Sequence, residues 1–440
     1  KSNIDEMPQL WNVLLGDMSS LTRADTPERI ERYLARLEAI PEYMGRISGV
    51  VRDGIETGQL APGLVVDRTI AQTEKLMALS PEQSPALAPL ESAPAAVRER
   101  AGSMFKDRIV PAFGRYLDAL KQYRPHATET IGLSALPNGE AMYAAEILSW
   151  TTLDLNPADV HRLGNEQLAA IQEERRALAV SLGFRDPEEA LAAHQATGRN
   201  VAGTRRELVE IAERQVEKGW EASKRFFGRM PARNCEVRPV EEYREQDMAM
   251  AFYFAPTADG SRAGIYYINT SDLPGRPLHH LATTTYHEAN PGHHLQVSIE
   301  QEIPDRPALR RFGGILAGSS FVEGWGLYTE RLADEMGLYS SDLSRLGVLS
   351  FDAWRASRLV VDTGMHALGW TRDQAIAFMT EHTALAANNI ANEIDRYIGL
   401  PGQALAYKTG QLEMLRLRAS AQARLGGRFD IRGFHDVLLG

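Results

Sequence analysis

The stretch His287-Glu288-Ala289-Asn290-Pro291-Gly292-His293-His294 places three imidazoles and one carboxylate within eight residues. In the common zinc motif H-E-x-x-H, two histidines four residues apart share one helix face and bind one metal, while the Glu faces the bound water. Here the second histidine follows the first by six or seven residues. The stretch therefore predicts a metal site on an interrupted helix. An amphipathic helix whose histidines only cap or hydrogen-bond is the alternative.

The residues between the histidines favour such an interruption. In a straight helix with a rise of about 1.5 Å per residue, the ligand Cα atoms would lie roughly 9 to 10 Å apart, which is long for Zn–N bonds of about 2.0 Å. Pro291 cannot continue a helix, Asn290 is a good N-cap, and Gly292 tolerates unusual dihedral angles. We expect a widened turn at Ala289-Asn290 that absorbs two extra residues.

Two adjacent histidines compete for the position of the second ligand. A turn that absorbs two residues brings His293 to that position, whereas His294 needs three absorbed residues. Helix phase therefore favours His293 as the ligand and His294 as a neighbour of the ligands or a substrate contact.

A third ligand is expected further along the chain, because catalytic zinc commonly has three protein ligands. Glu323 lies in a helix-like run with apolar neighbours, Phe321 to Glu330, where a buried carboxylate is costly without a cation. Glu330, seven residues later, shares its helix face and is expected to orient a ligand histidine. The alternative for both is a solvated position on the helix surface.

Four blocks of sequence resemble a known family. They are HEANPGHHLQ from residue 287, FVEGWGLYTE from residue 321, RLVVDTGMHALGWTRDQA from residue 358 and EIDRYIGLPGQALAYKTG from residue 393. These blocks look like those of the bacterial domain-of-unknown-function family 885, from about residue 20 to the last residue. That family is similar to zinc metallopeptidases of the thimet-oligopeptidase and angiotensin-converting-enzyme type. The resemblance implies a mostly helical zinc hydrolase that acts on peptides and a zinc site completed by a later Glu.

The resemblance also implies groups that assist hydrolysis. In the similar peptidases, a downstream His and Tyr donate hydrogen bonds to the carbonyl oxygen as it becomes an oxyanion. The corresponding candidates are His366, Tyr397 and Tyr407, and Arg396 is a candidate for holding a substrate carboxylate.

A short segment before the metal motif changes from helical to strand-like patterning. Cys235 to Val240, Met248 to Phe254 and Ala263 to Asn269 are short and rich in β-formers, with Asp259-Gly260 as a turn signal. They predict a small antiparallel sheet next to the active site. In the similar peptidases an edge strand pairs with extended substrate, and Gly264 to Asn269, with Gly264 and Tyr266 as substrate contacts, is the candidate edge. Strands that only pack beneath the helices are the alternative.

Elsewhere the chain has helical periodicity, so the predicted fold class is mostly α. We expect a helical N-terminal region at residues 1–230 and a catalytic region at residues 231–440, within one continuous globular unit. The expected helices begin at the capped start Ala24 to Glu28 and include Ala96 to Tyr123, Gly139 to Thr152, Asn156 to Leu182, Pro187 to Gln195, Thr204 to Phe227 and Ser340 to Gly369.

Composition excludes several classes of protein. The 440 residues are 44% hydrophobic and 24% charged, which is typical of globular proteins, and no apolar run reaches the 18 residues expected of a membrane span. A net charge of −10 argues against nucleic acid as the main partner. The single cysteine, Cys235, excludes an internal disulfide. The chain begins at Lys1 without Met, so both a cytoplasmic and an exported location are left open. The sequence leaves the oligomeric state open as well.

The sequence thus predicts zinc-assisted hydrolysis of short peptides. One zinc per chain is held by His287, His293 and Glu323, while Glu288 takes a proton from water and passes it to the leaving amine. A zinc hydrolase acting on another bond is one alternative. A noncatalytic helical binding protein with a closed structural metal site is the other.

Overall fold

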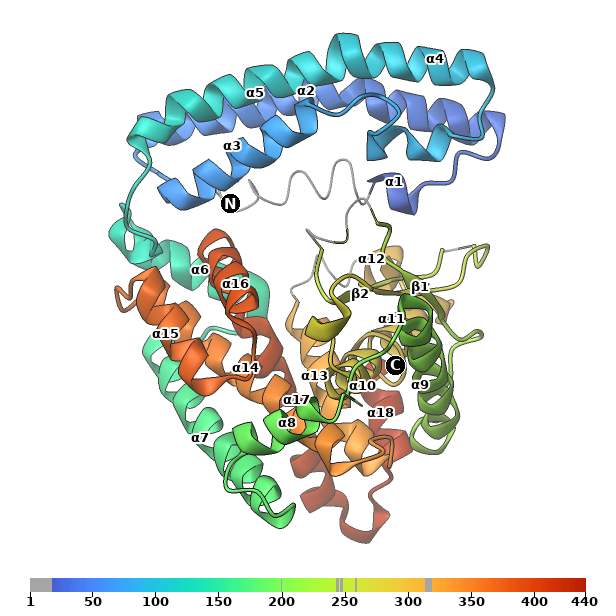
Figure 1. The fold of residues 1–440 in the computed structure, drawn as a ribbon, viewed down its shortest axis with the longest axis vertical. Helices are drawn as coiled ribbons and strands as arrows, with labels where there is room; N and C mark the ends of the chain where they lie inside the picture. The colour runs from blue at the N-terminus through green and yellow to red at the C-terminus, as the bar shows by residue number, and fades with distance from the viewer. Residues whose placement is uncertain (1–17, 199, 243–244, 246–247, 258, 313–318) are drawn as a thin grey trace. The chain divides into compact units, whose positions relative to one another are not determined.

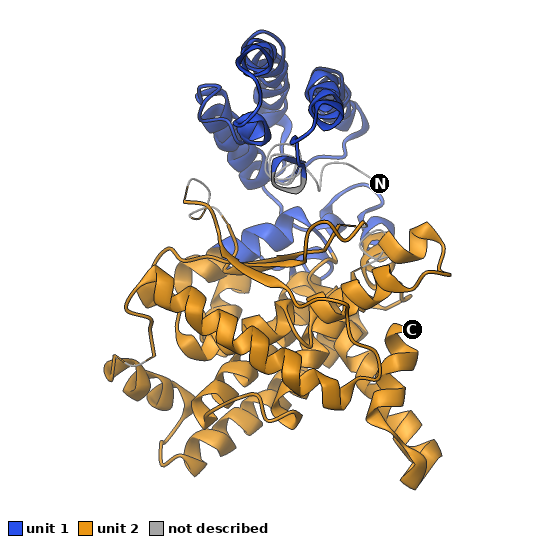
Figure 2. Ribbon diagram, turned by 90° about the vertical axis from the view of Figure 1, so that its right-hand side faces the viewer, with its two compact units in different colours: residues 1–143, 365–373, 392–401 blue, residues 144–364, 374–391, 402–440 orange. Residues whose placement is uncertain are grey.

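The computed structural model describes residues 18–198, 200–242, 245, 248–257, 259–312 and 319–440. These residues are mostly α-helical with one small sheet, which confirms the predicted fold class. They form two compact units (Figure 2): unit 1 comprises residues 1–143, 365–373 and 392–401, and unit 2 comprises residues 144–364, 374–391 and 402–440. The boundary expected at residue 230 lies inside unit 2.

Unit 1 is built around long helices that run side by side, α2 with α5 and α3 with α5 (Figure 1). Its elements are α1 (Met18–Leu21), α2 (Pro27–Thr57), α3 (Gly63–Met77), η2 (Pro85–Leu90), α4 (Ala95–Met104), the π-helical turn η3 (Phe105–Ile109), α5 (Val110–Tyr123), η4 (Arg124–His126) and η5 (Leu133–Ala135).

The predicted start of α2 is confirmed in detail. The side chain of Thr26 accepts a hydrogen bond from the backbone N–H of Arg29, and Pro27 occupies the first turn, where its missing N–H costs nothing. The helix ends at Gly58, whose φ of 71° belongs to the left-handed region that glycine adopts readily. Local sequence alone therefore specifies both ends of this helix.

Unit 2 holds the sheet and the helices of the predicted metal site. Its elements are α7 (Pro157–Ser181), α8 (Pro187–Ala196), α9 (Arg205–Phe226), β1 (Glu236–Pro239), β2 (Ala251–Phe254), β3 (Ile265–Ile268), η6 (Leu273–Gly275), α10 (Leu278–Glu288), α11 (His293–Glu302), α12 (Ala308–Phe312), α13 (Ser320–Glu335), α17 (Leu405–Leu425), η8 (Gly426–Arg428) and α18 (Ile431–Leu439). Four helices have residues in both units: α6 (Gly139–Thr151), α14 (Asp342–His366), α15 (Arg372–His382) and α16 (Ala387–Gly399).

The sheet differs from the prediction in order and direction. Its strand order is β1-β3-β2, with β3 parallel to β1 and antiparallel to β2, so it is mixed rather than antiparallel. The prediction that Gly264 to Asn269 forms an edge is wrong, because β3 pairs on both sides. All four residues of β3 are buried, as suits a central strand, whereas β1 exposes Glu236 and Arg238, as suits an edge.

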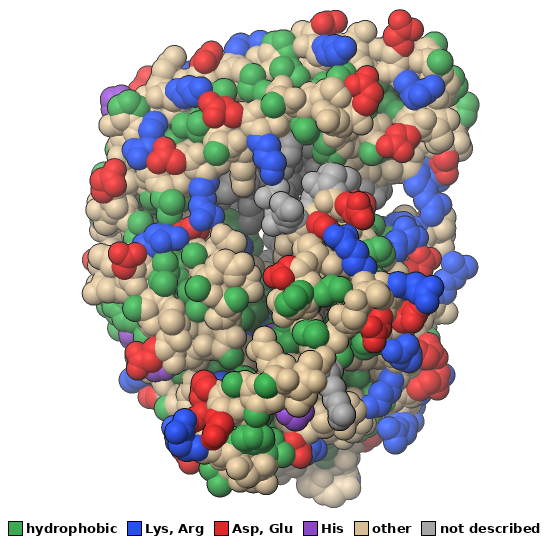
Figure 3. All heavy atoms as spheres, in the orientation of Figure 1, with side chains coloured by type: hydrophobic (Ala, Val, Ile, Leu, Met, Phe, Trp, Pro, Cys, Tyr) green, Lys and Arg blue, Asp and Glu red, His purple; other side chains and the backbone are tan. Residues whose placement is uncertain are grey.

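Charged side chains of both signs are interspersed over the face drawn in Figure 3. Among the residues that the structure describes, no helix is both long and apolar enough to cross a membrane.

A buried ion pair joins α14 to α17 in the core of unit 2. Lys408 Nζ lies 2.6 Å from Asp352 Oδ1, and Arg331 Nη2 lies 2.7 Å from the other carboxylate oxygen. Burial acts to raise the pKa of Asp352, but the charges of Lys408 and Arg331 outweigh it and lower that pKa. Asp352 therefore stays ionised with two cations.

Removing one partner of this pair is expected to destabilise the fold strongly. We expect Lys408→Met to lower the free energy of unfolding by about 3–5 kcal/mol, because it leaves a buried carboxylate with one cation fewer. The double variant Lys408→Met/Asp352→Asn should lose less than the sum of the two single variants. Denaturant unfolding measures both.

The control is Arg416→Ala, which removes an exposed pair with Glu413 and should change the free energy of unfolding by less than about 0.5 kcal/mol. A Lys408→Met protein as stable as this control would contradict the expectation.

Candidate metal centre

Helix α10 carries His287 and Glu288 through the interior of unit 2. The residues from His279 to His287 are all buried, since the helix packs against α9 and α13 as well as strand β2. Glu288, the last residue of the helix, is half-buried. The motif thus lies at the C-terminal end of a helix that neighbouring elements enclose.

The predicted interruption is present, as a complete break rather than a widened turn. Helix α10 ends at Glu288 and α11 begins at His293, with a cis peptide bond between Asn290 and Pro291. The indole N–H of Trp325 donates to the carbonyls of Pro291 and Gly292, at 3.0 and 3.2 Å. A Cβ on Gly292 would lie 1.8 Å from the carbonyl oxygen of His287, so only glycine fits there. Trp325 was not identified from the sequence as a residue that holds this break.

Helix α13 supplies two carboxylates to the same place. Glu323 and Glu330 lie seven residues apart and therefore on one face, as predicted. Gly326 lies between them, directly against the His287 ring: a Cβ at this position would be 2.5 Å from His287 Cε1. Gly326 thus leaves room for the His287 imidazole. The neighbouring Trp325 holds the break between α10 and α11 through its hydrogen bonds.

The predicted ligand atoms converge. The Nε2 atoms of His287 and His293 lie 3.5 and 3.6 Å from Glu323 Oε2, and the two imidazole ring centroids are 4.6 Å apart. Ligand atoms of tetrahedral zinc, with bonds of about 2.0–2.2 Å, are separated by roughly 3.4 Å. His293 Nδ1 is buried without a hydrogen-bond partner. Two nitrogens and one oxygen at these distances fit a metal with mixed N/O ligands.

Glu288 completes the cluster without competing contacts. One of its carboxylate oxygens lies within 4.8 Å of ring nitrogens of both His287 and His293. Burial raises the pKa of Glu288, against the opposing effect of the two histidines. A carboxylate of raised pKa beside two histidines is the kind of group that can take part in proton transfer.

The charges of the cluster favour a cation. Burial acts to lower the pKa of His287, but the contacts with Glu323 and Glu330 outweigh it and raise that pKa to about 10. Burial acts to raise the pKa of Glu323, but contacts with His287 and His293 hold it well below its usual range. A potential that favours a proton on His287 also favours a divalent cation.

Glu330 contacts Nδ1 of the His287 ring, the nitrogen that faces away from Glu323, as predicted. Its Oε1 lies 2.8 Å from His287 Nδ1, so Nδ1–H donates to Glu330 and Nε2 is directed towards Glu323, where a metal could replace its proton. Glu330 is only 1% exposed, and the guanidinium of Arg355 lies 3.8 Å from the same oxygen. The hydroxyl of Tyr339 donates to the Glu330 carbonyl at 2.8 Å. Arg355 and Tyr339 had no identifiable signal in the sequence.

His294 points away from the cluster. Its Nε2–H donates to the Arg233 carbonyl at 2.9 Å, and its Nδ1 accepts from the Tyr253 hydroxyl at 2.9 Å. Burial lowers the pKa of His294 to about 4, so the ring is neutral. His294 therefore links α11 to strand β2 and to the loop before β1.

Three of the residues implied by the resemblance lie in unit 1. His366 Nε2–H donates to the Tyr397 carbonyl at 3.0 Å, and its Nδ1 faces the Leu133 N–H at 3.4 Å. The Tyr397 hydroxyl donates to Glu393 Oε2 at 2.6 Å, and Arg396 pairs with the same carboxylate oxygen at 2.9 Å. Their roles in oxyanion and carboxylate binding stay predictions.

The other three implied residues lie in unit 2. Tyr407 is half-buried, and Arg358 Cζ lies 4.3 Å from its ring centroid. The carbonyl of Gly264 accepts from the N–H of Glu236, and the fully buried Tyr266 hydroxyl lies 3.2 Å from Thr285 Oγ1. Tyr266 therefore lies in the central strand β3, whose backbone is paired on both sides, and Gly264 lies directly before that strand.

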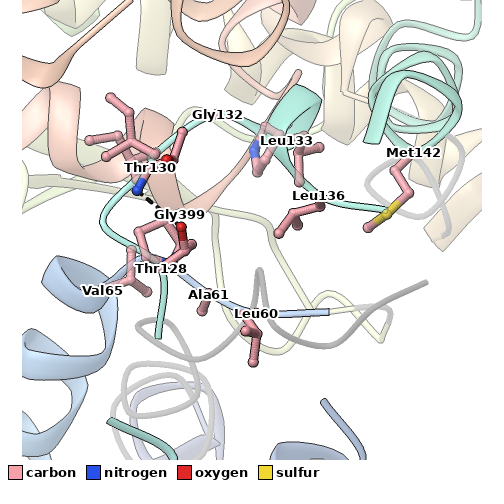
Figure 4. Close-up of a pocket in the computed structure, with 14 residues that line it drawn as sticks. Leu60, Ala61, Val65, Thr128, Thr130, Gly132, Leu133, Leu136, Met142 and Gly399 are labelled. Atoms are coloured by element: carbon pink, nitrogen blue, oxygen red, sulfur yellow. Dashed lines mark hydrogen bonds between the residues drawn. The ribbon is translucent and has the colours of Figure 1, made fainter. Parts of the chain in front are cut away.

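Unit 1 also contains a pocket of different character (Figure 4). Thr130 N–H donates to Thr128 Oγ1 at 3.0 Å on one wall. No residue lining it is titratable; the lining consists of Leu60, Ala61, Pro62, Val65, Thr128, Thr130, Ile131, Gly132, Leu133, Leu136, Met142, Ile398, Gly399 and Pro401. This pocket therefore offers no side chain for acid–base or metal chemistry.

The fold and this site define a mostly helical protein with a buried His/Glu cluster of metal-ligand type. Residues 3–440 match the family described as "Bacterial protein of unknown function (DUF885)", and the chain belongs to this family. No curated protein matches the chain.

Two solved structures are similar. The crystal structure of "the putative lipoprotein from Colwellia psychrerythraea" has a TM-score of 0.90 and 30% identity, covering 96% of this chain and 75% of that chain. A "putative lipoprotein of unknown function from Shewanella oneidensis" has a TM-score of 0.69 and 20% identity, covering 100% and 85%. The second likeness shows the fold alone.

The two adjacent histidines can be separated experimentally. We expect His293→Ala to lose zinc, because its Nε2 faces Glu323, and His294→Ala to retain zinc but melt at a lower temperature, because it loses the contacts with Tyr253 and Arg233. Metal content by mass spectrometry and thermal unfolding measure the two effects. The reverse pattern of zinc loss would refute this assignment.

Glu330→Gln tests the orientation of His287. We expect zinc affinity to fall about 10- to 100-fold, as is usual when the partner of a ligand histidine is changed. Competition with a chelator of known affinity measures it. Glu335→Gln, on the last turn of the same helix, is the control and should bind zinc as the unchanged protein does.

Proposed function

We propose that this protein is a zinc-dependent hydrolase, and specifically a metallopeptidase that cleaves short peptides. The observation that carries the proposal is the convergence of His287, His293 and Glu323 at 3.5–3.6 Å with Glu288 beside them. Glu330 behind His287 adds the carboxylate partner that ligand histidines usually have.

The residues of the cluster have distinct roles in this proposal. When bound, zinc supplies a Lewis acid that polarises a carbonyl group and acidifies water. His287, His293 and Glu323 would hold the metal, and the hydrogen bond to Glu330 keeps Nε2 of His287 turned towards Glu323. Glu288 accepts the proton of the attacking water and returns it to the leaving nitrogen, a role for which its raised pKa is suited.

The geometry favours a catalytic centre over a structural one. A closed structural site is expected to use both His293 and His294 as ligands, giving four protein ligands. Both ring nitrogens of His294 contact Arg233 and Tyr253 instead. With three protein ligands, a coordination position is available for water or substrate.

The zinc-loaded protein is expected to hydrolyse short peptides, and Glu288→Gln to reduce kcat at least about 100-fold while binding zinc normally. Mass spectrometry of products from a peptide mixture, with metal content measured in parallel, provides the test. Glu300→Gln on α11, whose carboxylate is outside the cluster, is the matched control and should keep full activity.

Full activity of Glu288→Gln would exclude the general-base role. Cleavage of esters or other amides without cleavage of peptides would favour the alternative, a zinc hydrolase that acts on a bond other than the peptide bond.

The description of the first similar structure bears on location. It is named a "putative lipoprotein", and lipoproteins are a class of exported proteins, so this favours an exported enzyme over a cytoplasmic one. Fractionation of cells that produce the complete protein would distinguish the two locations.

A further inference from the structure

The two histidines of the proposed metal site differ in what holds their rings. Nδ1–H of His287 donates to Glu330, and its Nε2 faces Glu323. Nε2 of His293 faces the same Glu323 carboxylate at 3.6 Å, but its Nδ1 is buried and has no hydrogen-bond partner among the described residues. A ligand histidine almost always donates from its second ring nitrogen to a carboxylate, a carbonyl or water. An acceptor for Nδ1 of His293 is therefore expected close by.

A side chain with the complementary need lies on the same helix. Gln296 follows His293 by three residues on α11 and is only 1% exposed. Its amide nitrogen donates to the carbonyl of Phe321 at 3.1 Å, which fixes the orientation of the amide, because a carbonyl oxygen can only accept. The amide oxygen, Gln296 Oε1, is buried without a hydrogen-bond partner in the described part of the chain. The helix thus carries one unpaired acceptor and one unpaired ring nitrogen.

Both side chains extend towards the first turns of α13. Nε2 of His293 faces Glu323, and the amide of Gln296 contacts Phe321, two residues earlier on that helix. Residues three apart lie on one face of a helix, and a helical side chain leans towards the N-terminus of its own helix. Since α11 begins at His293, the amide of Gln296 leans towards the turn that carries the His293 ring.

A second buried acceptor near this histidine extends in another direction. Asn290 Oδ1 also lacks a hydrogen-bond partner among the residues that the structure places. The Nδ2 of the same side chain donates to Asn234 Oδ1 at 2.7 Å. Asn290 therefore extends to the loop before β1, whereas His293 and Gln296 extend to α13. Gln296 is thus the better placed acceptor for His293.

We infer that Gln296 is a positioning residue of the metal centre, whose Oε1 accepts, through one bound water, the hydrogen bond that Nδ1–H of His293 donates. This inference rests on the proposed function and deepens it. An imidazole that binds a metal through Nε2 carries its proton on Nδ1. A water between this N–H and an amide oxygen accepts from the first and donates to the second. Gln296 then orients His293 as Glu330 orients His287.

The zinc affinities of two Gln296 variants test the inference. Gln296→Met keeps the length of the side chain but removes both the acceptor and the donor to Phe321. We expect zinc affinity to fall about 10- to 100-fold, as is usual when the partner of a ligand histidine is lost. Gln296→Glu keeps an acceptor, and a carboxylate is the stronger one, so this variant should bind zinc at least as tightly as the unchanged protein. Competition with a chelator of known affinity measures both.

The matched control is Ser298→Ala, which removes a buried polar group from the side of α11 that faces His294. This variant should bind zinc as the unchanged protein does. Thermal unfolding of the zinc-free proteins shows whether each variant folds. In addition, a crystal structure of the zinc-loaded protein should place a water within about 3.2 Å of both His293 Nδ1 and Gln296 Oε1.

Unchanged zinc affinity of Gln296→Met would overturn the inference. Equal losses in Gln296→Met and Gln296→Glu would do the same, because they would assign the effect to the contact with Phe321 alone. A different acceptor on Nδ1 of His293 in the zinc-loaded crystal structure would also contradict it. Failure of the proposed function is separate. If the affinities follow the expected pattern but the unchanged zinc-loaded protein cleaves no peptide, the positioning role stands and the peptidase assignment does not.

Discussion

The His287 imidazole between the buried carboxylate of Glu330 and the half-buried carboxylate of Glu323 is the interaction on which the organisation of unit 2 depends. Glu330 accepts from one ring nitrogen, and Glu323 faces the other. Buried carboxylates are unfavourable unless cations or hydrogen-bond donors compensate them, so helices that supply such partners must surround α13. Helices α10 and α11 supply His287 and His293, and α14 supplies Arg355. The same requirement makes the position between the ligands attractive to a divalent cation.

Close backbone approach sets the geometry of this charge cluster. Gly326 lets the His287 ring lie against α13, and Gly292 lets the chain turn back against the end of α10. Trp325 directly precedes Gly326 on α13. Its indole N–H donates to the carbonyls of Pro291 and Gly292, which lie in the break between α10 and α11. The lengthened spacing of the histidines is therefore accommodated by a break that α13 itself holds, which explains why both blocks of sequence occur together.

Local features were predicted well, and features that depend on distant partners were not. Helix starts such as that of α2 followed from capping residues, and the candidate status of His287, His293 and Glu323 followed from the spacing of the histidines and the cost of burying a carboxylate, although a break replaces the widened turn that the spacing suggested. The prediction that β3 lies at an edge of the sheet was wrong, because the neighbours of a strand depend on pairing with residues far away in the sequence. Its four buried residues were a usable signal for a central strand, since neither face is polar.

By itself the sequence determined the helical class, the boundaries of several helices such as α7 and α9, and the residue types of a candidate metal centre, because these depend on contacts within a few residues. Only the tertiary structure decided which histidine faces Glu323, that α10 and α11 are separate helices, and that Arg355 lies beside Glu330. His287 and Glu330 are 43 residues apart, and His294 and Arg233 are 61 apart. The direction of an imidazole is fixed by such partners, and their positions follow from packing of whole helices rather than from local preference.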